Sequence, residues 1–214
     1  MKNRLHDKKA GIAILVSLIL ISVAEVIYRA VIAKGFAFST SNFGEQLVVI
    51  GLALTILIFG AKGKDRICYI LYGAWIAFFV MDQLFELPGM VGELVMNISA
   101  PGVANSIVLR LVSMLCIIAL SALLVEYMND GSIYNRAFNI LTVITLLLLV
   151  VTIVLSICGI ILGVVPNGID LALLQQQVML IIFNNLYRIA MVFLFTFFAY
   201  DSAKKQLSKV DFSK

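Results

Sequence analysis

The sequence is poor in charged residues. Only 13% of its 214 residues are Asp, Glu, Lys or Arg, whereas 62% are hydrophobic and the mean hydropathy is +1.07. Soluble domains carry about a quarter charged residues, so this chain lacks the polar side chains that would cover a water-facing surface. The composition excludes an ordinary cytosolic enzyme, a secreted domain, a disordered tail and a nucleic-acid binder. It indicates a polytopic integral membrane protein whose main surroundings are the lipid bilayer.

Histidine and cysteine are also scarce. The single histidine, His6, lies in the charged amino-terminal segment, which excludes histidine-based metal sites and most histidine acid–base chemistry. Cys68, Cys116 and Cys158 form no CxxC pair, so a thiol–disulfide exchange role has no support. No lysine occurs within an apolar run, and no GxxxxGK[ST] motif is present. We therefore expect no catalytic constellation, no metal site and no cofactor.

The apolar runs predict the fold. A hydrocarbon core about 30 Å thick needs about 20 helical residues. We predict an all-α bundle of six transmembrane helices that forms a single integral membrane domain over residues 1–214. The predicted spans cover residues 10–33, 46–61, 67–86, 105–127, 137–165 and 176–200. The second span is short, so its ends must lie near the interface or the bilayer must thin locally.

The connections between the spans are short. The longest, residues 87–104, contains Pro88 and Pro101, and we expect it to be an extracellular loop. A short interfacial or re-entrant helix over Met90–Ile98 is the alternative, since non-helical backbone at membrane depth needs protein or water around it.

Basic residues in the flanks predict the orientation, because positively charged loops stay cytoplasmic. Lys34 alone falls on the side opposite the termini, and twelve basic residues fall on the side of the termini. These are Lys2, Arg4, Lys8, Lys9, Lys62, Lys64, Arg66, Arg136, Lys204, Lys205, Lys209 and Lys214. We therefore predict that both termini are cytoplasmic, in the plasma (inner) membrane. Ser22-Val23-Ala24 resembles a signal cleavage site, but the apolar run continues to Ala33, so we expect this segment to remain as a span.

Apart from the cytoplasmic ends of the predicted spans, the spans contain six ionised side chains, and each costs about 2.5–3.5 kcal/mol at a helix centre. Given the direction of each span, all six lie between the midplane and the outer face. The three acids and three bases are able to neutralise one another. They are Glu25, Arg29, Asp82, Glu86, Arg110 and Arg188.

Helical spacing places these charges in four polar stripes. The stripes are Ser22, Glu25 and Arg29; Trp75, Phe79, Asp82 and Glu86; Arg110, Ser113 and Ser121; and Gln177, Asn184 and Arg188. If the stripes converge, they line an outward-opening cavity. We predict that its charged side chains bind a small zwitterionic or anionic solute, and that Trp75 and Asn184 shape the cavity. The predicted charged ligands are Glu25, Arg29, Asp82, Arg110 and Arg188.

Two functions fit this pattern. The first is a small-molecule binding or transport component. The second is a non-transporting sensor, immunity or assembly protein, whose charges hold helices together or grip a transmembrane segment of a partner subunit. Gly159 and Gly163 form a GxxxG motif that permits close helix approach, which leaves a homo-oligomer open. A binding site predicts a polar cavity of at least several hundred cubic ångströms, whereas a structural network predicts direct carboxylate–guanidinium contacts without a void.

The size of the chain and its predicted six-span layout, with both termini cytoplasmic, resemble the substrate-binding subunits of energy-coupling-factor vitamin importers. Of the small-residue motif of their first helix, this sequence has only Ala10 and Ala13. The resemblance is one of architecture, and it implies a solute-binding membrane component.

Overall fold

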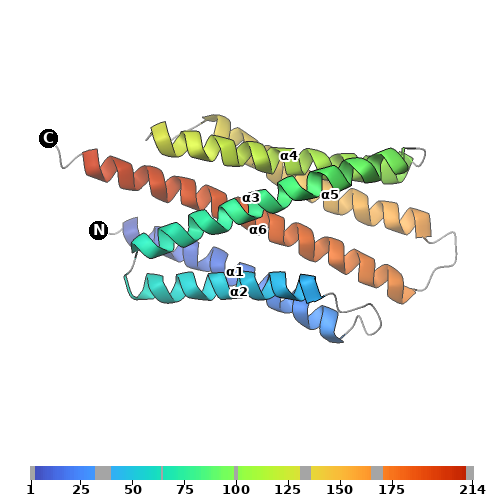
Figure 1. The fold of residues 1–214 in the computed structure, drawn as a ribbon, viewed down its shortest axis with the longest axis horizontal. Coiled ribbons are helices and arrows are strands. Elements are labelled where there is room, and N and C mark those ends of the chain that lie inside the picture. Colours follow the sequence, from blue (N-terminus) through green and yellow to red (C-terminus); the bar gives the residue numbers. More distant parts are fainter. Residues whose placement is uncertain are drawn as a thin grey trace.

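A computed structural model describes residues 3–31, 40–63, 65–98, 101–130, 136–164 and 171–210. These residues form six α-helices joined by short connections (Figure 1). The helices are α1 (Asn3–Val31), α2 (Thr40–Ala61), α3 (Asp65–Met96), α4 (Pro101–Asp130), α5 (Arg136–Val164) and α6 (Leu171–Val210). The predicted all-α class is therefore confirmed for the described residues. Four of the basic residues that predict the orientation lie outside the described residues, namely Lys2, Lys34, Lys64 and Lys214.

In the described part of the chain, five helices are long and apolar enough to cross a membrane. The qualifying stretches are Lys9–Ala30, Arg66–Met96, Ala104–Leu124, Arg136–Ile161 and Gln177–Asp201. Helix α2 contributes a shorter apolar stretch, Gln46–Ala61. Large apolar side chains such as Leu20 and Phe85 are mostly exposed on the outside of the bundle. These features are compatible with an integral membrane protein, because lipid would cover such a surface.

Successive helices run in alternating directions, so the two termini lie at the same end of the bundle (Figure 1). Helix α6 lies centrally and contacts α1, α3, α4 and α5. It supplies a large share of the fully buried side chains, including Met191, Leu194 and Phe195, which pack with Leu18 of α1 and Ile117 of α4. The remaining helix pairs in contact are α1–α2, α2–α3, α3–α4 and α4–α5.

Helix α3 corrects the prediction for residues 87–104. Neither an extracellular loop nor a separate short helix forms over residues 87–96, because α3 continues through Pro88 to Met96. Proline removes one helical hydrogen bond, but a loop in apolar surroundings would leave more backbone groups unpaired. Met90 also packs against α4 beside Ile107 and Met114, and this packing stabilises the longer helix. Helix α4 then begins at Pro101, a position where the missing N–H has no helical partner.

Helices α4 and α6 also exceed their predicted lengths. Residues 128–130 and 171–175, predicted as connections, are helical, and α6 extends beyond residue 200 to Val210. The apolar pattern identifies only the part of a helix that lies in lipid, so polar helical ends escape it.

Candidate functional site

A polar cavity of about 210 Å³ lies where α1, α2, α3 and α6 meet. Helices α1 and α3 contribute residues from their later halves, and α2 contributes one from its start. The cavity therefore lies between the middle of the bundle and the end opposite the termini (Figure 1). Its lining comprises Glu25, Arg29, Gln46, Phe79, Asp82, Gln83, Glu86, Leu180, Asn184, Tyr187 and Arg188. The predicted polar stripes of α1, α3 and α6 thus converge.

One wall of the cavity is built around Glu25, which is only 4% exposed. Its Oε1 accepts a hydrogen bond from Nε of Arg29 at 2.9 Å, and a second guanidinium nitrogen forms an ion pair with the same oxygen. Its Oε2 accepts a hydrogen bond from Nε2 of Gln46 at 2.9 Å, which links α1 to α2. The two charges are four residues apart on one helix and neutralise each other, so this pairing follows from local geometry.

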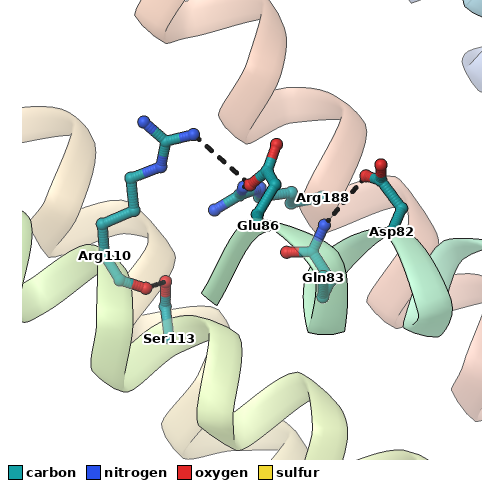
Figure 2. Close-up of polar contacts among 6 residues, drawn as sticks. All are labelled: Asp82, Gln83, Glu86, Arg110, Ser113 and Arg188. Atoms are coloured by element: carbon teal, nitrogen blue, oxygen red, sulfur yellow. Dashed lines mark hydrogen bonds and ion pairs between the residues drawn. The ribbon is translucent and has the colours of Figure 1, made fainter. Parts of the chain in front are cut away.

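The opposite wall contains a carboxylate shared by two arginines (Figure 2). Oε2 of Glu86 on α3 accepts hydrogen bonds from Arg188 of α6 at 3.0 Å and from Arg110 of α4 at 3.5 Å. The Arg188 side chain is 4% exposed, whereas those of Arg110 and Glu86 are 37% and 38% exposed. A guanidinium as deeply buried as Arg188 requires a charged partner, and Glu86 provides it while joining three helices.

Asp82 differs from the other two acids. Its carboxylate accepts a hydrogen bond from Nε2 of Gln83 at 3.3 Å (Figure 2). Among the described residues, no arginine or lysine lies within 4.0 Å of it. Asp82 therefore supplies the cavity with a negative charge that no ion pair neutralises.

Buried polar atoms in this region also lack partners. Oε1 of Gln46 and Oε1 of Gln83 are fully buried and accept no hydrogen bond, and the same holds for the hydroxyl of Ser22. Both glutamines line the cavity and donate their amide N–H groups to neighbouring carboxylates. Each of these two side chains thus has a carbonyl oxygen without a partner, beside an amide group that donates one of its two N–H bonds.

Five of the seven predicted site residues line the cavity, namely Glu25, Arg29, Asp82, Asn184 and Arg188. Trp75 does not, contrary to its predicted place as the aromatic wall. It lies in the apolar core at 1% exposure, two helical turns before Asp82. Arg110 also lies outside the lining and reaches the site only through Glu86.

Other residues of the lining were not among the predicted site residues. Phe79 and Tyr187 form the aromatic part of the wall, with ring centroids 5.8 Å apart in an edge-on arrangement. Gln46 and Gln83 are neutral and were therefore missed, although Gln46 donates to the buried Glu25 and Gln83 donates to Asp82. Residues Ser113 and Ser121 donate instead to backbone carbonyls of their own helix, as a hydroxyl in an apolar helix commonly does.

The structure combines features of both functions weighed from the sequence. Direct carboxylate–guanidinium contacts are present, as a structural network requires. A void is present as well, but its 210 Å³ is smaller than the cavity expected for a typical ligand site. A cavity of about 150 Å³ holds a benzene molecule, so this one has room for a slightly larger solute.

No protein-family model, curated protein or solved structure matches the chain. Within the described residues, no group of three or more His, Cys, Asp or Glu side chains could hold a metal ion. Functional inference therefore depends on the geometry of the cavity.

Proposed function

We propose that this chain is a membrane-embedded binding component for a small polar solute, which occupies the cavity between α1, α2, α3 and α6. The observation that carries the proposal is a void beside buried polar atoms that have no partner. Leaving a buried acceptor unpaired costs about 1–3 kcal/mol. A bundle selected only for stability would close such a void or fill it with apolar side chains. After a small rotation of the Gln46 and Gln83 side chains, a solute that donates hydrogen bonds would satisfy their two oxygens.

We further propose that the solute enters from the outer side of the plasma membrane. The basic flanks favour cytoplasmic termini, and the cavity lies toward the opposite end of the bundle. A component of this kind would serve in solute uptake or in sensing, with or without a partner membrane subunit.

The structural alternative has its own support in the contact of Glu86 with both Arg110 and Arg188. In that function, the ionic side chains hold α3, α4 and α6 together, and the cavity contains only water. The chain would then act as a sensor, immunity or assembly protein in which no small solute binds.

A thermal-unfolding screen of the purified protein in detergent distinguishes the two. The compounds are amino acids, vitamins, small amines, small carboxylates and lipid headgroups. A ligand at a hundred times its Kd stabilises by about 2.7 kcal/mol, which corresponds to an increase in Tm of roughly 5–11 °C for a chain of this size. If no class of compound raises Tm, the binding function is wrong.

A cavity-filling variant provides the matched test. Asn184 lines the cavity and makes no ion pair, so Asn184→Trp should fill the void and abolish the ligand-dependent shift. Leu186, two residues further along α6, is exposed and lies outside the lining. Leu186→Trp should therefore leave the shift intact, and equal loss in both variants would argue against this cavity as the site.

A further inference from the structure

We propose that the solute is a small organic cation, whose ammonium group forms an ion pair with Asp82. This inference rests on the proposed function and specifies the chemical class of the ligand. It stands on three independent features of the cavity: its charge, the kind of hydrogen-bonding atom left unpaired, and its aromatic wall.

The charge of the lining favours a cation. Its acids are Glu25, Asp82 and Glu86 and its bases are Arg29 and Arg188, which leaves one negative charge in excess. Glu25 and Glu86 already pair with arginines, so the excess resides on Asp82. Arg110 pairs with Glu86 from outside the lining, so the positive charge that balances the three acids overall lies outside the cavity.

The unpaired atoms favour a donor. Gln46 and Gln83 are 8% and 1% exposed, and the carbonyl oxygen of each has no hydrogen-bond partner. An ammonium group carries donors and no acceptor, so it complements these oxygens and the Asp82 carboxylate. A carboxylate or phosphate has only acceptors, so it would leave both oxygens unpaired and would be repelled by Asp82.

The aromatic wall and the volume limit the shape of the ligand. Phe79 and Tyr187 line the same cavity as Asp82, and aromatic faces attract cations within about 6 Å of the ring centroid. Scaling from the cavity of about 150 Å³ that holds benzene gives roughly eight non-hydrogen atoms. The expected ligand is therefore a primary or quaternary amine with one small apolar substituent.

Four probes of nearly equal size test this inference on the full-length protein in a neutral detergent. They are benzylamine (cation), benzyl alcohol (neutral), benzoate (anion) and proline (zwitterion), and binding is followed by Tm and by isothermal titration. We expect benzylamine to raise Tm and to bind, and the neutral and anionic probes to do neither. Choline and butylamine, run beside benzylamine, extend the test to cations without an aromatic ring.

Asp82→Asn is the decisive variant, because it removes the charge at constant shape and disrupts no ion pair. It should weaken amine binding by about ten- to a hundredfold, the usual loss for a hydrogen bond to a charged group. Glu93→Gln, an exposed acid on the same helix and outside the lining, should leave amine binding unchanged.

The outcomes separate this inference from the proposed function. If benzoate binds, the inference of a cationic solute is wrong, but the proposed binding function still holds. The same conclusion follows if proline binds the Asp82→Asn variant as tightly as it binds the original protein. Equal binding of benzylamine and benzyl alcohol would likewise overturn the inference. If no cationic, neutral, anionic or zwitterionic probe binds, both the inference and the proposed function fail.

Discussion

Glu86 of α3 and Arg188 of α6 are 102 residues apart in the chain, yet their side chains meet at 3.0 Å. The two partners differ in burial, since the Arg188 side chain is 4% exposed and that of Glu86 is 38% exposed. Glu86 also has a second partner in Arg110, whereas Arg188 forms its only described ion pair with Glu86. Removing one partner should therefore have a different effect from removing the other.

We expect Glu86→Gln to destabilise the protein strongly, because it removes the only acid that forms an ion pair with the buried guanidinium of Arg188 among the described residues. Breaking a buried pair in this way costs about 3 kcal/mol or more, which corresponds to a decrease in Tm of roughly 6–12 °C. Thermal unfolding in detergent measures the effect. Glu93→Gln, an exposed acid on the same helix, should change stability by less than about 0.5 kcal/mol.

Arg188→Met should cost less than Glu86→Gln, because the remaining Glu86 carboxylate is half-exposed and keeps its contact with Arg110. The double variant should be more stable than Glu86→Gln alone, since it contains no unpaired buried guanidinium. The double-mutant cycle on unfolding free energies tests this asymmetry. Equal losses in the two single variants, with simple addition in the double variant, would contradict it.

Gly11 marks a close approach between α1 and α6. A Cβ atom added there would lie 2.6 Å from Cζ of Phe197, so Gly11→Ala should force the ring to move and destabilise the bundle by about 1–3 kcal/mol. At Gly51 nothing lies within 4 Å, and Gly51→Ala should be neutral or stabilise by up to about 1 kcal/mol. Thermal unfolding compares the two. A second change, Phe197→Leu, should recover part of the loss in Gly11→Ala.

Pro88 lies inside α3 and is exposed. Pro88→Ala should restore one helical hydrogen bond and leave the helix in place, with a gain in stability of up to about 3 kcal/mol. Circular dichroism should show unchanged helix content, and thermal unfolding should show an equal or higher Tm. A lower Tm would mean that the packing of Met90 beside α4 depends on the proline.

The orientation is open to direct measurement. Lys62 lies in the α2–α3 turn and Ile98 in the turn after α3, at opposite ends of that helix, and both are exposed. In a background without Cys68, Cys116 and Cys158, we expect a membrane-impermeant maleimide to label Ile98→Cys in intact cells. Lys62→Cys should react only after permeabilisation. The reverse pattern would place the termini outside and the cavity toward the cytoplasm.

The fold was largely predictable because membrane helices are recognisable from local composition. Apolar runs located all six helices, and five of the six charges that were predicted to gather line a single cavity. The error at residues 87–96 came from treating Pro88 as a stop signal. In apolar surroundings, the cost of unpaired loop backbone exceeds the cost of one missing helical hydrogen bond.

The site was predictable only in part, because rotation of each helix decides which residues face one another. Trp75 and Asp82 were predicted to line one cavity because they share a face of α3. In the structure Trp75 packs in the apolar core, and only Asp82 lines the cavity. The sequence does not identify Gln46 and Gln83 as site residues, because the role of a neutral amide depends on the acid to which it donates in the folded structure.

By itself, the sequence determined the apolar helices and the pairing of Glu25 with Arg29, because both depend on the period of a single helix. Only the tertiary structure decided that Glu86 pairs with Arg188 and Arg110, and that Asp82 forms no ion pair within 4.0 Å among the described residues. These choices depend on how rigid helices rotate and cross against one another, and that arrangement is set by packing over the whole bundle.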